Sequence, residues 1–438
     1  MAAKTDRFYF KLDGQNYLFH RDSFSILKLP GKTISASEEK RLSNILKKEE
    51  GKARTVGKLT LRTVALNLTN NCNFACDYCF ANHGRYDKPG LCMSKEIAIK
   101  AIDLLFENIS RNHQKRAAIA FFGGEPLLAW DLIKTIVVYA KKNKPKGVRL
   151  KFLITTNASL LNKDKIDFFN KNNFSVMVSI DGPRKVNDAN RKLPNGEGSY
   201  DLIIPQIIEA NKSIPLTFRA TVTNNNLDLI RIIDHFRQLG AKIITFGLDN
   251  NNLKKENYKK IMKSYKKLAN KYCQDIMKGN FYEITNFTEI LLQIVFKEKK
   301  ISHCNAGLSY LGVAADGSMY KCPRFTGIPG HKFAHIKNWK EVAERLGAFK
   351  SELRENAGAR NTHCSQCPFM FLCGGLCHYD LFQKGKDDSD IIEEQCLLRK
   401  KIYLEVIKLY AKIPEDVKKD FFLYLTDSFQ EQRGGEKS

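Results

Sequence analysis

Three closely spaced cysteines are the residues of this chain best suited to carry chemistry. Cys72, Cys76 and Cys79 form the pattern C-x3-C-x2-C within NNCNFACDYCFANHG. Three thiolates on one short loop can hold three irons of a [4Fe–4S] cluster and leave the fourth iron open to another ligand. A C-x2-C pair is also typical of a zinc knuckle, so the triplet alone leaves iron and zinc as alternatives.

Seven further cysteines lie in the last third of the chain. They follow the order Cys304-x12-Gly317-x4-Cys322, then C-x2-C-x5-C-x3-C from 364 to 377, then Cys396. A zinc ribbon uses four cysteines in two C-x2-C pairs, and this array contains one such pair. The chain starts with the polar segment MAAKTDRFYF, which lacks the apolar stretch of a signal peptide. We therefore expect a reducing, cytoplasmic location and metal binding instead of disulfides.

Two of the twelve cysteines, Cys92 and Cys273, belong to neither group. We predict that each is a small buried residue, which is the common role of a free cysteine. Cys273 is the better candidate for an additional metal ligand, because it lies on a helical stretch shortly before the second cysteine array.

An alternation of strands and helices begins at about residue 62 and must position the first cysteine group. Amphipathic segments with helical spacing, such as SKEIAIKAIDLLFENI, separate the strands. This order predicts right-handed βαβ units in a parallel sheet or open barrel, with ligands at the carboxyl ends of the strands. The predicted strands are TVALNLT (63–69), AAIAFF (117–122), VRLKFLITT (148–156), FSVMVSI (174–180), LTFRATVT (216–223) and KIITFGL (242–248).

Polar motifs follow the predicted strands, as the cysteine loop does. Gly123-Gly124-Glu125-Pro126 follows the second, Thr156-Asn157 ends the third, and Ser179-Ile180-Asp181-Gly182-Pro183 ends the fourth. Two glycines allow the backbone to approach a ligand closely, and the proline is expected to end its strand. Arg191 and Arg219 are candidates for binding the carboxylate of a ligand or substrate.

Residues 62–250 resemble the radical S-adenosylmethionine (SAM) superfamily in the cysteine triplet, in the aromatic residue before its third cysteine, and in GGEP. The resemblance implies that Cys72, Cys76 and Cys79 bind a [4Fe–4S] cluster whose open iron chelates SAM. An electron from that cluster would cleave SAM to a 5′-deoxyadenosyl radical, with the cofactor carrying the chemistry. It also implies that Glu125 accepts hydrogen bonds from the SAM ammonium group. The implied SAM-binding residues are Gly123, Gly124, Glu125, Pro126, Tyr78, Asn157, Ser179, Asp181 and Arg191.

The second cysteine array resembles the SPASM domain of radical SAM peptide-modifying enzymes, which implies two auxiliary [4Fe–4S] clusters. One would be bound by Cys364, Cys367, Cys373 and Cys396, and the other by Cys304, Cys322 and Cys377. The second set is one ligand short, and residues 295–303 contain no cysteine. An open iron there could bind a substrate cysteine thiolate, a soft ligand suited to iron.

We expect an α/β fold: a partial (β/α)6 TIM-like barrel, a cysteine-rich SPASM domain and a small β-rich appendage. The predicted segments are 1–60 (appendage), 61–290 (radical SAM core), 300–400 (auxiliary-cluster domain) and 401–438 (C-terminal helix and tail). The last segments hold one helix at about 391–411 and a polar tail. In the appendage, RFYFKL, QNYLF and SFSILKL precede a charged helix. It is either a reduced leader-peptide recognition element or a cap on the barrel.

The net charge of +25 comes from lysines spread along the chain, which is typical of a solvated surface. A zinc-stabilised nucleic-acid-binding module would need basic and aromatic residues clustered on one element, and none is found. No apolar run is long enough to span a membrane. We therefore expect no membrane and no nucleic-acid partner, but a peptide or protein substrate and a low-potential electron donor such as flavodoxin or ferredoxin.

Enzymes that this chain resembles divide into peptide maturases that form thioether or other crosslinks, anaerobic sulfatase maturases that make formylglycine, and maturases of peptide-derived cofactors. In the sulfatase maturases an Asp general base follows the second cysteine of the C-x12-G-x4-C segment. Here that position is Pro323, followed by Arg324. Because proline cannot accept a proton, the sequence favours an oxidoreductase that crosslinks a ribosomally made peptide.

Overall fold

The computed structural model describes residues 6–30, 36–50, 60–300, 302–338, 344–345, 362–384 and 389–433. The chain divides into two compact units, each described here by itself. The sheet unit comprises Lys58–Leu253, Asn305–Glu352 and Tyr424–Ser438. The helical unit comprises Met1–Gly57, Lys254–Cys304 and Leu353–Leu423. The cysteine array between residues 304 and 396 is thus divided between the two units. The domain boundaries given above remain a prediction.

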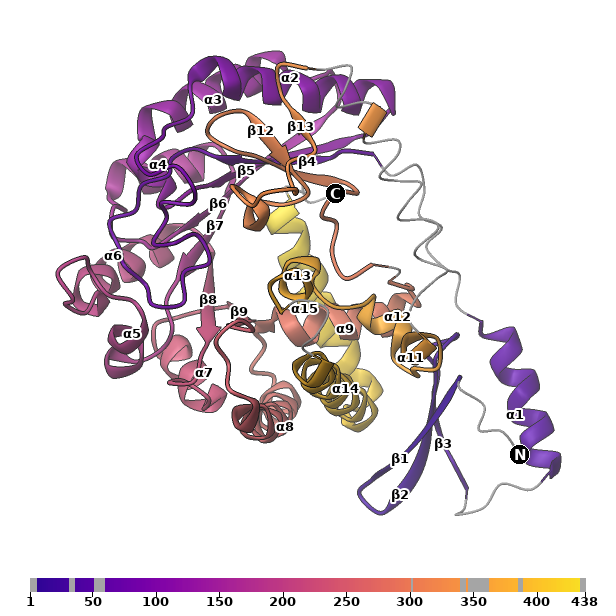
Figure 1. Ribbon diagram of the computed structural model, residues 1–438. Coiled ribbons are helices and arrows are strands. Elements are labelled where there is room, and N and C mark those ends of the chain that lie inside the picture. The colour runs from indigo at the N-terminus through magenta and orange to yellow at the C-terminus, as the bar shows by residue number, and fades with distance from the viewer. Residues whose placement is uncertain are drawn as a thin grey trace. The chain divides into compact units, whose positions relative to one another are not determined.

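The sheet unit is built on six parallel strands that pair in sequence order, as the alternating pattern predicts (Figure 1). They are β4 (Thr63–Asn67), β5 (Arg116–Phe122), β6 (Arg149–Thr156), β7 (Phe174–Ser179), β8 (Leu216–Val222) and β9 (Ile243–Leu248). Three short strands extend the sheet beyond β4: β11 (Tyr310–Val313) pairs parallel with β4, followed by β12 (Ser318–Tyr320) and β13 (Ala334–His335) in antiparallel pairing. The sheet therefore incorporates the segment around Cys322.

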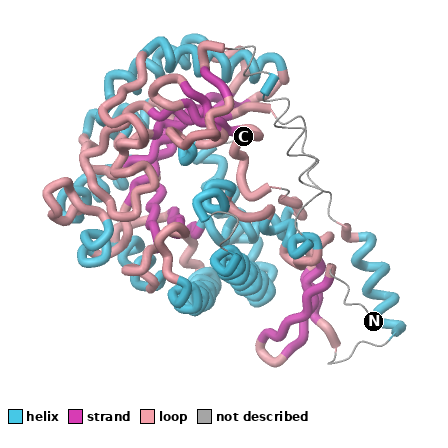
Figure 2. Tube along the Cα trace, viewed as in Figure 1, coloured by secondary structure: helices cyan, strands magenta, loops and turns pink. Residues whose placement is uncertain are grey.

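Helices between the strands cover one face of this sheet (Figures 1 and 2). They are α2 (Lys95–Arg111), α3 (Trp130–Asn143), α4 (Lys163–Lys171), α5 (Arg184–Asn190), α6 (Tyr200–Ser213) and α7 (Leu229–Gln238). Ser94 caps α2 by accepting a hydrogen bond from the Ile97 amide, and Asn162 caps α4 in the same way. Stacked rings of Phe121, Phe152 and Phe174 form the core between sheet and helices.

The helical unit contains the predicted appendage, a three-stranded antiparallel sheet with one helix. Its strands are β1 (Arg7–Leu12), β2 (Gln15–His20) and β3 (Ile26–Lys28), followed by α1 (Ala36–Lys48). The Lys-rich stretch forms α8 (Lys255–Met277), which packs against α14 (Ser389–Lys412). The remaining elements are β10 (Glu283–Ile284), α9 (Thr285–Phe296), α11 (Thr362–Ser365), α12 (Met370–Cys373) and α13 (His378–Lys384).

The C-terminus differs from the expectation of one helix and a polar tail. The predicted helix at 391–411 is α14, but a second helix, α15, follows over Glu415–Arg433. Phe421 and Leu425 of α15 are fully buried, whereas many of its other residues are charged. These charged residues hid the apolar positions in the sequence. Only residues 434–438 of the predicted tail lie outside the described residues.

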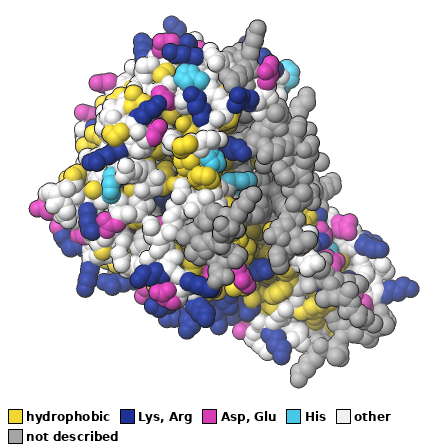
Figure 3. All heavy atoms as spheres, viewed as in Figure 1, with side chains coloured by type: hydrophobic (Ala, Val, Ile, Leu, Met, Phe, Trp, Pro, Cys, Tyr) yellow, Lys and Arg dark blue, Asp and Glu magenta, His cyan; other side chains and the backbone are white. Residues whose placement is uncertain are grey.

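Lys and Arg side chains are spread over the face seen in Figure 3 and gather most densely over α8. This agrees with a solvated lysine-rich surface. Among the described helices, we find none that combines the length and the hydropathy needed to cross a membrane.

Candidate iron–sulfur and SAM site

The cysteine triplet lies on the loop that follows β4, at the carboxyl end of the parallel strands. The thiols of Cys72, Cys76 and Cys79 lie close enough to influence one another's ionisation. Burial raises the pKa of the Cys72 thiol to about 12 and that of Cys76 to about 11, although the Arg191 guanidinium opposes the shift at Cys76. Three neighbouring, partly buried thiols form a preassembled ligand set that exchanges protons for metal.

Two glycines bring other backbone segments into contact with this loop. A methyl group on Gly124 would lie 2.1 Å from the Asn71 carbonyl oxygen, and one on Gly84 would lie 2.6 Å from Cβ of Cys72. The Gly124 amide donates to the Thr69 carbonyl at 2.8 Å, and the Glu125 amide donates to that of Asn71 at 2.9 Å. The glycines of GGEP were expected to admit a ligand. What they approach in the structure is the cysteine loop itself.

The Glu125 carboxylate is 1% exposed and joins two of the predicted motifs. Its Oε1 accepts from the Thr156 hydroxyl at 2.7 Å and the Leu127 amide at 3.0 Å, and its Oε2 accepts from the Asn157 amide at 2.7 Å. These three bonds use part of the acceptor capacity of the carboxylate and hold the end of β6 against the loop after β5. The expected hydrogen bond from the SAM ammonium group stays a prediction.

Two other residues of these motifs also serve the framework. Pro126 does not end the strand as predicted: β5 ends at Phe122, and Pro126 begins a 3-10 helix, η1 (Pro126–Ala129). Pro is suited to that first position because it has no amide hydrogen to satisfy. The Asn157 side chain donates to the side-chain oxygen of Asn73 at 2.9 Å, which ties the end of β6 to the cysteine loop.

A buried charged cluster connects the ends of β7 and β8 to the same loop. The Arg191 guanidinium donates to the Tyr78 hydroxyl at 2.6 Å and lies 5.8 Å from the Phe74 ring centroid. Asp181 is fully buried and accepts from the Thr221 amide at 2.9 Å. Burial raises the pKa of the Asp181 carboxyl, and Arg191 is the main group opposing that shift. Three residues predicted to bind SAM are therefore brought together next to Cys76.

Ser179 is the last residue of β7, and it pairs in the sheet with Arg219 of β8. Both residues lie near the carboxyl ends of the parallel strands. Ser179 is 9% exposed. The Arg219 guanidinium donates to the Thr221 hydroxyl at 3.3 Å. A methyl group on Gly247 would lie 2.6 Å from that guanidinium, so Gly247 provides the space that Arg219 occupies. Burial lowers the Arg219 pKa. A buried cation of this kind favours an anionic partner.

Several buried polar atoms near the carboxyl ends of the strands have no hydrogen-bond partner within the described part of the protein, and a polar ligand could supply one. Buried polar groups normally have hydrogen-bond partners, so several such atoms in one place indicate a ligand. SAM carries ammonium, carboxylate, hydroxyl and adenine groups that can satisfy both donors and acceptors. The residues therefore fit SAM beside a cluster, and their individual contacts stay a prediction. The atoms are Asn67 Oδ1, His83 Nδ1, Asp181 Oδ2, Asn190 Nδ2 and Arg191 Nε.

Sequence reasoning missed Asn67, His83 and Asn190 as site candidates. Asn67 is the last residue of β4, but the predicted strand continued to residue 69, so its position at a strand end was hidden. His83 lies four residues after Cys79, and Asn190 immediately precedes Arg191. Neither position belongs to a spacing pattern that would distinguish it from an ordinary loop residue.

In the helical unit, four cysteines from α11, α12, α14 and the turn between α11 and α12 lie near one another. We call Cys364, Cys367, Cys373 and Cys396 the four-cysteine set. Cys364 and Cys373 raise the pKa values of the Cys367 and Cys396 thiols, in addition to the larger effect of burial. Their mutual influence agrees with the predicted ligand set for one auxiliary cluster. Of the second predicted set, Cys304 and Cys377 belong to this unit and Cys322 to the sheet unit, so that set stays a prediction.

The two remaining cysteines behave differently from each other. Cys273 is 4% exposed on α8, and burial raises its thiol pKa, as expected for a small core residue. Cys92 was also predicted to be buried, but it is exposed, with its sulfur 3.4 Å from the Thr69 hydroxyl. The prediction failed because Cys92 pairs with Thr69 in an isolated bridge of the loop region, where no apolar layer covers it.

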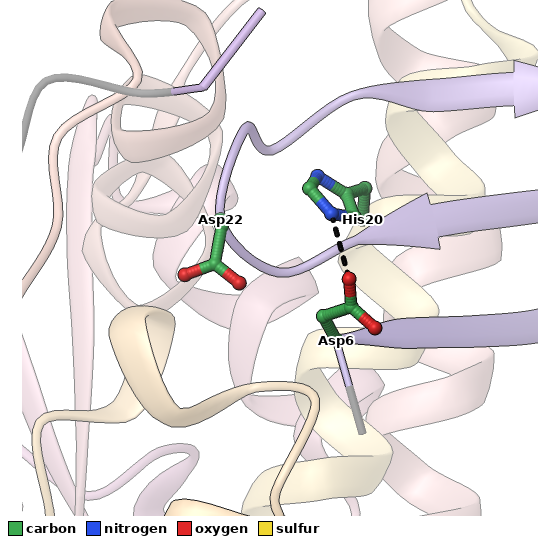
Figure 4. A group of neighbouring side chains, drawn as sticks. All are labelled: Asp6, His20 and Asp22. Carbon is green, nitrogen blue, oxygen red and sulfur yellow. Dashed lines mark hydrogen bonds and ion pairs between the residues drawn. The ribbon is translucent and has the colours of Figure 1, made fainter. Parts of the chain in front are cut away.

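Asp6, His20 and Asp22 of the helical unit also lie within metal-binding reach of one another (Figure 4). The Asp22 carboxylate, however, pairs with Arg21 at 3.1 Å and with Lys299 at 3.4 Å. Nδ1 of His20 accepts from the Ser23 amide, which leaves Nε2 to donate to Asp6 at 3.2 Å. Protein cations and hydrogen bonds thus account for this group, and sequence spacing had not indicated it.

The comparisons with known proteins agree with this site. The radical SAM superfamily model matches residues 66–226. A cysteine-type anaerobic sulfatase-maturating enzyme of Clostridium novyi (strain NT) is 28% identical over 74% of this chain and 90% of its own. A protein of Methanocaldococcus jannaschii without an assigned function is 30% identical over 60% of this chain and 92% of its own. The radical SAM cyclopropyl synthase TigE of Paramaledivibacter caminithermalis is 25% identical over 72% of this chain and 68% of its own.

Solved structures show the same fold. Native anSMEcpe with bound AdoMet superposes with a TM-score of 0.67 at 20% identity, over 80% of this chain and 100% of that one. Streptococcus suis SuiB bound to the precursor peptide SuiA superposes with a TM-score of 0.51 at 14% identity, over 87% and 96%. The chain belongs to the radical SAM superfamily. It is an enzyme of that superfamily, with the predicted partial-barrel α/β fold.

Proposed function

We propose that this protein is an oxygen-sensitive, cytoplasmic radical SAM enzyme that oxidatively crosslinks a ribosomally made peptide. The observation that carries the proposal is the cysteine triplet, whose loop is packed against Gly84 and Gly124 at the carboxyl ends of the strands. When bound, the [4Fe–4S] cluster and SAM would supply a 5′-deoxyadenosyl radical that removes a hydrogen atom from the substrate.

The protein's own residues have positioning roles in this proposal. Cys72, Cys76 and Cys79 hold the cluster, and the Glu125 carboxylate fixes the backbone on which SAM lies. Arg191 and Tyr78 place a hydrogen-bonded cation beside Cys76, where it offsets negative charge on the thiolates. Unsatisfied atoms of Asn67, Asp181 and Asn190 orient the polar groups of SAM.

A peptide substrate is supported by the relatives and by residue 323. TigE is named as a cyclopropyl synthase, and SuiB was solved with its precursor peptide, so the proteins that this chain is similar to include others besides sulfatase maturases. In this chain Pro323 is buried and begins the 3-10 helix η2 (Pro323–Phe325). A proline there cannot act as the general base expected in a sulfatase maturase.

Sulfatase maturation remains the second candidate, because the Clostridium novyi relative covers most of both chains. It would need a base other than residue 323. Asp316 lies in the same segment, but its carboxylate pairs with Lys88 at 2.6 Å. Although burial of Asp316 works in the opposite direction, hydrogen bonds from Lys88 and Ser318 lower its pKa. A carboxylate held ionised in this way is a weak proton acceptor.

The appendage supports leader-peptide binding. One face of α1 lines a shallow cavity of about 380 Å³, and this face carries three cations beside the partly exposed Ile45. Such a surface suits an acidic peptide with an apolar anchor, while β1 and β3, the edge strands of the described three-stranded sheet, suit an extended one. The cavity residues are Ser37, Lys40, Arg41, Asn44, Ile45 and Lys48.

Two further parts of the proposal rest on the auxiliary sites. The four-cysteine set would hold one cluster that accepts the electron left on the oxidised peptide. The set of Cys304, Cys322 and Cys377 would hold a second cluster with an open iron for a substrate thiolate. A low-potential donor such as flavodoxin or ferredoxin would supply the electron for SAM cleavage.

The deciding measurement is iron, sulfide and zinc per chain after anaerobic reconstitution, together with 5′-deoxyadenosine formation from SAM. We expect about twelve irons, from three four-iron clusters. Replacing Cys72, Cys76 and Cys79 together by Ala should remove about four irons and abolish SAM cleavage while the auxiliary clusters remain. Retained cleavage in that variant would refute the cluster assignment, and zinc in place of iron would refute the redox function.

A further inference from the structure

The electrostatic surroundings of the four-cysteine set come from one face of α14. Cys396, Arg399 and Tyr403 are spaced three and four residues apart on this helix, so they lie on the same side. Arg399 and Tyr403 lie near Cys373, since Arg399 donates to the Gly375 carbonyl oxygen at 3.4 Å and the Cys373 thiol influences the ionisation of both side chains. Cys373 itself ends α12 and points its thiol toward the Gly375 carbonyl at 3.3 Å. Helix α14 thus supplies a predicted ligand and two polar side chains, one of them a cation, on the side that faces Cys373.

Arg399 also reaches the segment that carries Cys304. Its Nη1 lies 3.1 Å from Nδ1 of His303 and 3.4 Å from the Gly375 carbonyl oxygen. The two segments are in direct contact, since a methyl group on Gly374 would lie 2.4 Å from the Ser302 carbonyl oxygen. One guanidinium therefore bonds to segments that bear ligands of both predicted auxiliary clusters.

The bond to His303 determines how that imidazole can act. A guanidinium has no acceptor, so Nδ1 of His303 must be the unprotonated acceptor, and Nε2 then carries the ring hydrogen. A neutral imidazole in this tautomer has no free nitrogen lone pair to offer iron. His303 is thus a hydrogen-bond partner of Arg399 in this structure.

A cation and hydrogen bonds at a cysteine ligand change the energy of the cluster. Reduction adds one negative charge, and a nearby positive charge stabilises the reduced form. Hydrogen bonds to the sulfurs and exclusion of water are recognised controls of the potentials of iron–sulfur clusters. Because burial limits screening by solvent and salt, the effect of Arg399 exceeds that of an exposed lysine on the same helix.

We propose that Arg399, assisted by Tyr403, is a positioning residue that raises the reduction potential of the cluster bound by the four-cysteine set. This rests on the proposed function, in which that set binds a [4Fe–4S] cluster. The chemical purpose is to let this cluster accept an electron from a substrate radical more readily than the SAM-cleaving cluster would.

The test is a redox titration of the auxiliary clusters followed by electron paramagnetic resonance. It uses the full-length protein with Cys72, Cys76 and Cys79 replaced by Ala, so that only auxiliary clusters contribute signals. Arg399→Met should lower the midpoint potential, Arg399→Lys should recover part of the difference, and Tyr403→Phe should lower it by less. Lys408→Met is the matched control, because it removes one charge from α14 about 13 Å along the helix from Arg399.

Iron content separates the possible failures. A wild-type chain that binds zinc or no iron at the four-cysteine set would refute the proposed auxiliary cluster. Full iron with an unchanged potential in Arg399→Met would refute the role of Arg399 alone. If Arg399→Met does not assemble the cluster, the Arg399→Lys and Tyr403→Phe variants decide: unchanged potentials in both would overturn the inference.

Discussion

Replacing Gly124 by Ala should damage the cysteine loop without touching a cysteine. The added methyl would lie 2.1 Å from the carbonyl oxygen and 2.4 Å from the carbonyl carbon of Asn71. Since non-bonded carbon and oxygen atoms rarely approach closer than about 3.0–3.4 Å, the loop must move by about 1 Å. Overpacking of this kind costs about 1–3 kcal/mol, and the two hydrogen bonds at Gly124 and Glu125 contribute about 1 kcal/mol each.

The functional consequence should exceed the loss of stability. A displacement of about 1 Å at a reacting centre can reduce a rate by about a hundredfold. We expect Gly124→Ala to retain most of its fold, to bind less iron at the triplet, and to form 5′-deoxyadenosine about a hundredfold more slowly. Gly147→Ala is the control for backbone strain without close contact, because Gly147 has a positive φ and no neighbouring atoms within 4 Å. Wild-type iron and cleavage in Gly124→Ala would refute the argument from close contact.

Three more predictions address other parts of the molecule. Glu125→Gln removes the charge of the buried carboxylate between β5 and β6 and turns an amide donor toward existing donors. The free energy of unfolding in a denaturant titration should therefore fall by about 1–3 kcal/mol. The exposed Glu107→Gln variant is the control and should change it much less. Burial lowers the pKa of Lys151 to about 8, so about half of the Lys151 side chains are neutral at pH 8. Amine labelling followed by mass spectrometry should therefore modify Lys151 faster at pH 8 than at pH 6, with the rise in rate centred near pH 8. Reversing two charges on α1 with Lys40→Glu and Lys48→Glu should weaken binding of an acidic leader peptide in fluorescence anisotropy, most strongly at low salt, while leaving SAM cleavage without peptide unchanged. Equal peptide affinities at all salt concentrations would contradict the last of these.

Much of the fold was accessible from the sequence because its signals are local. All six parallel strands were predicted within a few residues, since apolar β-rich runs alternate with amphipathic helical segments. The appendage and α8 were predicted for the same reason. Helix α15 was missed because its buried positions, such as Phe421 and Leu425, are diluted by charged residues. Its formation depends on packing partners that are distant in sequence.

The roles of the site residues were less accessible than their positions. Spacing correctly indicated that GGEP belongs next to the cysteine loop, but not that Gly124 contacts the backbone of Asn71. It identified Glu125, but not the hydrogen bonds that its carboxylate accepts from Thr156 and Asn157 at the end of β6. Glu125 and Thr156 are separated in the chain by α3 and most of β6, so only the folded structure shows that the Thr156 hydroxyl donates to the Glu125 carboxylate.

The sequence by itself determined the chemistry that this protein can attempt. Cysteine number and spacing predict the metal ligands, because a ligand set on one short loop depends on its local covalent geometry. Only the tertiary structure decided what surrounds those ligands. The Arg191 cation beside Cys76, the buried Asp181, and Arg399 at Cys373 come from elements far away in the chain. Their effects depend on distance and burial, and neither is encoded in any single segment.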